Sequence, residues 1–120
     1  MRAFRAHAAL GILLLLVVGC AGTPQGRAKN LANAVTNAII QDNPGVVSHD
    51  LRDASKSVSR AEVGVLSDEM NALGNYQGLT LLAFDAQKNE FDFRATFAKG
   101  SKRVVVRLDT KNNLSAYRVF

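Results

Sequence analysis

The hydrophobic period of the chain changes at Gly74, and this change constrains the fold more than any other feature of the 120 residues. Before Gly74, apolar residues recur three and four positions apart, which indicates helices with one buried face. After Gly74, apolar and polar residues alternate, which predicts strands with one buried face and one wet face. Helices followed by strands, instead of alternating with them, are typical of an α+β fold.

Two helices are predicted in the first part of this region. The first covers about residues 25–42, and Thr23 with Pro24 forms a suitable N-terminal cap for it. Pro44 and Gly45 end it, and a short second helix is expected over residues 46–54. The first helix has apolar residues on one face, which we expect to be buried: Ala28, Leu31, Val35, Ala38 and Ile39.

The third predicted helix has the clearest local signals. Ser59 and Glu62 have the spacing of a capping box, in which each side chain satisfies a backbone N–H of the other residue. Gly74 suits the left-handed conformation that closes a helix. The buried face of this helix is predicted to consist of Val63, Leu66, Met70 and Leu73.

Four strands are predicted after Gly74, over residues 79–84, 90–97, 103–109 and 114–120. Short polar turns join them, so we expect an antiparallel meander whose apolar face is covered by the N-terminal helices. The apolar face of the two middle strands is predicted to consist of Phe91, Phe93, Ala95, Phe97, Val104, Val106 and Leu108.

The region from about residue 31 to 120 resembles small bacterial domains of the nuclear transport factor 2-like, or cystatin-like, superfamily. This resemblance, to members of unknown function, implies N-terminal helices packed on a four-stranded antiparallel meander sheet. Some members are enzymes with an Asp, and often a Tyr or His, in a cavity between sheet and helix, but no residue here matches that set. The residues that carry the resemblance are Leu73-Gly74, Phe93, Phe97, Lys99-Gly100, Val104, Val106, Leu108 and Asp109.

The segment before the predicted domain has the features of a secretory signal peptide. Arg2 and Arg5 give it a positive start, and residues 8–19 are uncharged. A membrane-spanning helix needs about 20 apolar residues, so this run is too short to span comfortably. A positive start, a short apolar middle and a small residue at its end indicate a signal peptide at residues 1–19.

The end of that segment, Val17-Val18-Gly19-Cys20, resembles the bacterial lipobox. The resemblance implies cleavage before Cys20, a diacylglyceryl thioether on its sulfur, and acylation of its new amino group, with palmitate as the typical acyl chain. By the sorting rule of enteric-type bacteria, Ala21 in place of Asp favours the outer membrane, facing the periplasm. We therefore expect a lipidated tether at residues 20–26 and one α+β domain at residues 27–120.

Charge and composition exclude several functions for the processed chain. Loss of Arg2 and Arg5 lowers the formal net charge from +5 to +3, so the mature protein is only mildly basic. No nucleic-acid motif is visible, so we expect no nucleic-acid partner. Cys20 is the only cysteine, and its predicted lipidation leaves no thiol for a disulfide or a nucleophile.

Few residues are candidates for catalysis or metal binding. His49 lies beside Asp50, and Asp53 is one helical turn away, which would suit an oriented base, but we favour a solvated residue on a short helix. Tyr76 and Tyr117 have no acidic neighbour in the sequence, which favours packing roles. We predict no metal, no cofactor and no catalytic set.

The arginines of the strands form the one candidate binding surface. Four of them are expected on the wet face of the sheet, with Asp92 and Asp109 among them: Arg94, Arg103, Arg107 and Arg118. Arginine is enriched at protein contacts, although cross-strand ion pairs on a solvated face would give the same pattern. Phe120 is a second candidate, either as part of the last strand pair or as a hydrophobic contact.

These patterns predict a non-catalytic envelope lipoprotein, bound to the bilayer through Cys20, whose domain binds another envelope protein. Two alternatives remain open: a small-molecule-binding or enzymatic cavity domain of the same fold, and an immunity or secretion-accessory lipoprotein.

Overall fold

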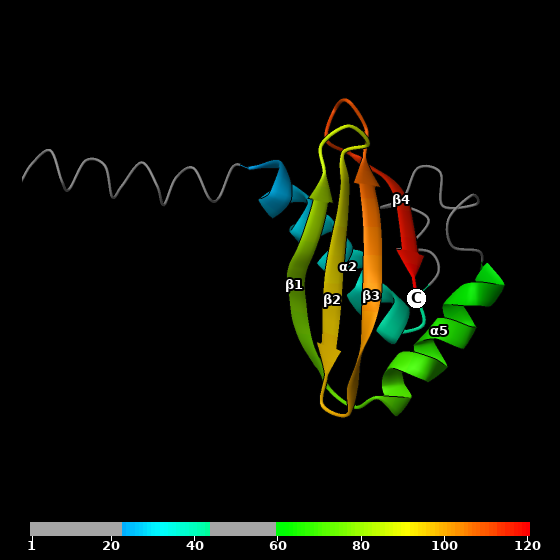
Figure 1. The fold of residues 1–120 in the computed structure, drawn as a ribbon. Helices are drawn as coiled ribbons and strands as arrows, with labels where there is room; N and C mark the ends of the chain where they lie inside the picture. The colour runs from blue at the N-terminus through cyan, green and yellow to red at the C-terminus, as the bar shows by residue number, and fades with distance from the viewer. Residues whose placement is uncertain (1–22, 44–59) are drawn as a thin grey trace, which may run out of the picture.

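The computed structural model describes residues 23–43 and 60–120, which form two helices followed by one sheet (Figure 1). The expected α+β fold and antiparallel meander are confirmed, with strand order β1-β2-β3-β4. Cys20, His49, Ser59 and the short helix expected over residues 46–54 lie outside the described residues. The elements are α2 (Pro24–Ile40), α5 (Arg60–Ala72), β1 (Tyr76–Asp85), β2 (Glu90–Phe97), β3 (Gly100–Leu108) and β4 (Leu114–Val119).

Helix α2 begins where the cap signals predict. The side-chain oxygen of Thr23 accepts a hydrogen bond of 3.1 Å from the backbone N–H of Gly26, and Pro24 occupies the first turn. Such a cap satisfies one of the free N–H groups at a helix start. The helix thus includes residues 24–26, which the sequence analysis assigned to the tether, and it ends at Ile40, two residues before the predicted end.

The core lies between α2 and one face of the sheet, and the predicted apolar faces form it. Leu31 is half-buried, and the other predicted face residues of α2 are buried with Ala32 and Thr36. Small side chains let the helix approach the sheet, where larger side chains fill the space. The predicted inward residues of the two middle strands are at most 3% exposed: Phe91, Phe93, Ala95, Phe97, Val104, Val106 and Leu108.

Helix α5 packs beside α2 and is joined to it by polar contacts (Figure 1). The carbonyl oxygen of Ile40, in the last turn of α2, accepts hydrogen bonds from Ser67 Oγ at 3.2 Å and Asn71 Nδ2 at 3.1 Å. These bonds satisfy a carbonyl that a helix end otherwise leaves free. As predicted, Val63 and Met70 are buried, while Leu66 and Leu73 are half-buried.

The end of α5 is fixed to the turn between β2 and β3. The N–H of Lys99 donates to the carbonyl oxygen of Leu73 at 2.8 Å. Phe97 pairs directly with Gly100, so the turn consists of Ala98 and Lys99 and is shorter than the polar stretch 98–102 suggested. Gly74 has φ +85°, and a Cβ added there would lie 3.1 Å from the Cβ of Ala98.

Two glycine substitutions test this junction. Gly74→Ala should destabilise the fold by about 1–2 kcal/mol, because a Cβ opposes left-handed backbone and also crowds Ala98. Gly64→Ala, inside α5 with open space around its added Cβ, should instead stabilise by about 0.4–1 kcal/mol. Urea unfolding measures both, and equal shifts of the two midpoints would contradict the assigned backbone at Gly74.

One buried hydrogen bond connects α2 to the last strand. Tyr117 is fully buried, and its hydroxyl lies 2.7 Å from Thr36 Oγ. Thr36 Oγ donates its hydrogen to the carbonyl oxygen of Ala32 at 2.8 Å, so Tyr117 is the donor in the bond that they share. Within the described residues, no buried side-chain nitrogen or oxygen lacks a hydrogen-bond partner.

This donor assignment predicts unequal effects of removing either hydroxyl. Thr36→Val leaves the buried Tyr117 O–H without an acceptor and should lower the free energy of unfolding by about 1–3 kcal/mol. Tyr117→Phe leaves no buried donor unpaired and should lower it by about 0.5–1.5 kcal/mol. The double variant should cost less than the two losses added together. Urea melts of the three variants measure this; additive and equal losses would show that the bond contributes nothing.

Candidate functional site

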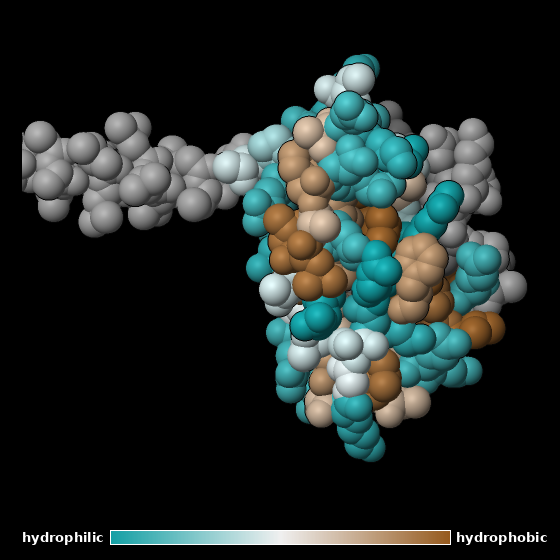
Figure 2. Space-filling model, in the orientation of Figure 1, coloured by the Kyte–Doolittle hydropathy of each residue, from teal (hydrophilic) through white to brown (hydrophobic). Residues whose placement is uncertain are grey.

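The face of the sheet opposite α2, here called the outer face, is not covered by either described helix. Figure 2 views this face, with hydrophobic side chains over β1 and hydrophilic ones over the middle strands. Alternation along the strands places on it Glu90, Asp92, Arg94 and Thr96 of β2, Arg103, Val105 and Arg107 of β3, and Ala116 and Arg118 of β4.

Strand register brings the four predicted arginines together. Arg94 lies directly opposite Arg103, while Arg107 lies opposite Ala116 and Arg118 lies opposite Val105. All four arginines are exposed, and they occupy three adjacent strands. Directly opposed like charges destabilise a sheet, so the Arg94–Arg103 pair is not explained by stability.

Two of the arginines form ion pairs within this face. Arg103 makes a bidentate contact with Asp92, in which Nε lies 3.3 Å from Oδ1, and the hydrogen bond and charge of Asp92 raise the pKa of Arg103. Arg107 Nη2 lies 3.0 Å from Glu90 Oε2. Exposed pairs of this kind contribute about 0–1 kcal/mol each. These pairs restrain the two guanidinium groups but add little to the stability of the fold.

The expected place of Asp109 among the arginines is wrong. Its Oδ1 accepts hydrogen bonds of 2.9 Å from the backbone N–H groups of Lys111 and Asn113. Asp109 therefore closes the turn between β3 and β4. Aspartate side chains commonly do this by accepting hydrogen bonds from backbone N–H groups a few residues later in the chain. Glu90 was not predicted as the acidic partner of Arg107, because only the strand register puts those residues opposite each other.

Arg94 and Arg118 differ from the other two. Within the part of the chain that the structure describes, neither side chain has an ion pair or hydrogen bond. Phe120, predicted as a candidate contact, is 64% exposed, and its ring centroid lies 5.9 Å from the guanidinium carbon of Arg103. Two unpaired cations and an exposed aromatic ring therefore adjoin one face.

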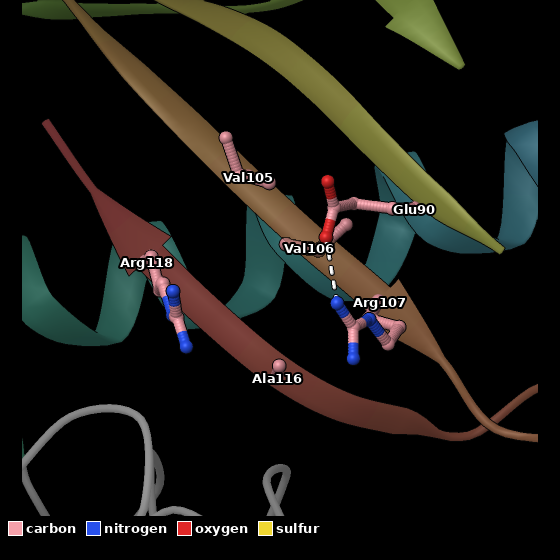
Figure 3. A pocket seen from close by; sticks show the side chains of 6 residues that line it. All are labelled: Glu90, Val105, Val106, Arg107, Ala116 and Arg118. Atoms are coloured by element: carbon pink, nitrogen blue, oxygen red, sulfur yellow. Dashed lines mark hydrogen bonds and ion pairs between the residues drawn. The ribbon is translucent and has the colours of Figure 1, made fainter. Parts of the chain in front are cut away.

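A shallow hollow of about 40 Å³ lies on this face between β3 and β4. Figure 3 shows Ala116 between the side chains of Arg107 and Arg118, with Val105 and Glu90 at the rim. Sites for small molecules usually have roughly 300–1,000 Å³. The hollow has room for one functional group of a larger partner.

The inward face of the sheet offers little to catalysis. The buried Tyr117 hydroxyl is bonded to Thr36, and burial raises the pKa of Tyr117 far above its usual range. Burial also raises the pKa of Tyr76 to about 12, and its hydroxyl donates to Asn33 Oδ1 at 2.7 Å. Both hydroxyls are therefore weak acids at neutral pH, consistent with the packing roles predicted for them.

The described residues show neither a metal site nor a membrane-spanning helix. Residues 23–43 and 60–120 contain no group of three or more His, Cys, Asp or Glu side chains placed to bind a metal. The described helices include none with the length and apolar character needed to cross a bilayer. Comparison of the chain with protein-family models, curated proteins and solved structures finds no match.

Proposed function

We propose that this chain is a lipid-anchored, non-catalytic module of the bacterial envelope that binds another protein through the outer face of its sheet. The observation that carries the proposal is the pair of unpaired arginines, Arg94 and Arg118, on a sheet face that neither described helix covers. Arginine is among the residues most enriched in protein interfaces, and an exposed aromatic ring such as Phe120 adds contact area.

The proposed anchor is Cys20, with Ala21 directing the protein to the outer membrane. Each buried methylene of an acyl chain contributes about 0.8 kcal/mol, so several chains on one cysteine would hold a small domain stably. Because α2 starts at Pro24, the segment between the proposed anchor and this helix is very short. The domain would therefore remain close to the bilayer surface and meet partners there.

The alternative of a small-molecule or enzymatic cavity has less support. In the cavity version of the fold, a substrate would lie between the sheet and the helix, but Phe91, Phe93 and Val106 there are at most 1% exposed. The immunity and secretion-accessory alternatives differ from our proposal in the identity of the partner, and would use the same kind of surface.

Lipidation of Cys20 predicts a clear loss on substitution. Cys20→Ser should abolish incorporation of a clickable fatty acid and leave the unprocessed precursor, because serine offers no sulfur for the thioether. The wild-type protein should not react with maleimide even when denatured, since its only cysteine is a thioether, whereas a Thr80→Cys variant should react. Normal processing and membrane retention of Cys20→Ser would refute the anchor.

Partner binding predicts a strong effect of charge reversal on the outer face. Arg94→Glu combined with Arg118→Glu should prevent copurification of the native partner, because like charge at a contact is unfavourable. Stability should change little, since neither arginine has an ion-pair or hydrogen-bond partner in the described part of the chain. The matched control is Lys29→Glu with Lys111→Glu, which changes the net charge equally at exposed positions off this face. His49→Ala should also retain binding.

Thermal melts of each variant separate unfolding from lost contact. If the Arg94→Glu and Arg118→Glu double variant still copurifies its partner fully and His49→Ala loses function, a catalytic proposal would replace the binding proposal.

A further inference from the structure

We propose that the hollow between Arg107 and Arg118 binds one carboxylate side chain, from Asp or Glu, of an acidic segment in the partner protein. This inference rests on the proposed function and specifies the chemistry of its contact. It follows from the placement of two guanidinium groups around a small, partly apolar depression.

The two arginines are positioned to share one anion. Arg107 lies opposite Ala116 and Arg118 follows two residues later, so they are diagonal neighbours on adjacent strands, with backbones about 7–8 Å apart. Side chains as long as arginine can both reach a group that sits between them. The ion pair with Glu90 involves Nη2 of Arg107, and a guanidinium carries five N–H donors, so Arg107 keeps donors for a second acceptor.

Arg118 supplies a guanidinium group that is available to an incoming carboxylate. Its side chain makes no ion pair within the described residues, whereas Arg103 and Arg107 make one each. A guanidinium matches the planar, two-oxygen geometry of a carboxylate and binds it through two parallel hydrogen bonds. An incoming carboxylate would therefore pair with Arg118 as the acidic residues of β2 already pair with Arg103 and Arg107 of β3.

The size and lining of the hollow favour a side chain over a free metabolite. Ala116 is the small residue that leaves space between the two arginines (Figure 3), and Val105, which lies opposite Arg118, provides an apolar part of the lining. The methylene stem of a glutamate can lie against such a surface while its carboxylate reaches the guanidinium groups. A volume of about 40 Å³ admits that group and little more.

The charge pattern favours a protein over an anionic membrane surface. Glu90 and Asp92 lie on the same face as the arginines, and a continuous layer of negative headgroups would bring like charge against both. A folded or extended protein segment can place one carboxylate in the hollow, where two guanidinium groups outnumber the single carboxylate of Glu90, and a second at Arg94, and can leave Asp92 uncovered. Electrostatic complementarity of this patterned kind provides specificity between proteins.

The test uses the full chain in detergent with two fluorescent peptides, one of alternating glutamate and alanine and one with glutamine in place of glutamate. The wild-type protein should bind the glutamate peptide more tightly. Arg118→Gln should weaken that binding about tenfold, the effect expected for losing a charge-assisted hydrogen bond. Ala116→Leu should weaken it similarly by filling the hollow at unchanged charge, while Arg118→Lys should keep part of the affinity.

Lys29→Gln is the matched control, because it removes one positive charge at an exposed position on α2; it should change the affinity less than about twofold, as expected for an exposed charge. Equal binding of the two peptides, or equal effects of Arg118→Gln and Lys29→Gln, would overturn the inference. Binding of phosphatidylglycerol vesicles that depends on Arg118, without peptide binding, would also overturn it in favour of a lipid site. The proposed function fails separately, when the Arg94→Glu and Arg118→Glu variant still copurifies its partner.

Discussion

The hydrogen bond between Tyr117 and Thr36 determines how the last strand presents its side chains. Tyr117 is fully buried against α2, with its hydroxyl held by Thr36. Successive side chains of a strand point to opposite faces, so an inward Tyr117 requires Ala116 and Arg118 to point outward. The hollow on the outer face therefore depends on a contact in the core, and a slip of β4 by one residue would bury Arg118 and expose the tyrosine.

The position of Arg94 opposite Arg103 on the outer face depends on the end of α5. The N–H of Lys99 is bonded to the carbonyl oxygen of Leu73, and the turn after β2 contains only Ala98 and Lys99. Turn length sets strand register in a hairpin, so this short turn places Arg94 opposite Arg103. The left-handed Gly74 is what allows the chain to leave the helix there, close to Ala98.

The sequence was sufficient to predict the faces of the elements, because burial follows periodicities of 3.6 and 2. The buried phenylalanines of β2 and the capped start of α2 at Thr23 are examples. It could not supply the strand register, so the pairing of Arg107 with Glu90 was missed. The predicted position of Asp109 was also wrong. A carboxylate can accept hydrogen bonds from an arginine or from the backbone of its own turn, and the sequence does not distinguish the two.

The arrangement of charge on the outer face does not follow from folding stability, and the proposed binding of a partner would account for it. A sheet selected for stability alone would alternate opposite charges across its strands, as Glu90 and Arg107 do. Arg94 faces Arg103 instead, and Arg118 lies opposite Val105 and makes no hydrogen bond to an acidic side chain of residues 23–43 or 60–120. Departures from local consistency of this kind concentrate at functional sites. Because each exposed charge pair contributes so little to stability, the fold can hold unpaired arginines at small cost. The same arginines then remain fully available to a carboxylate that arrives from outside.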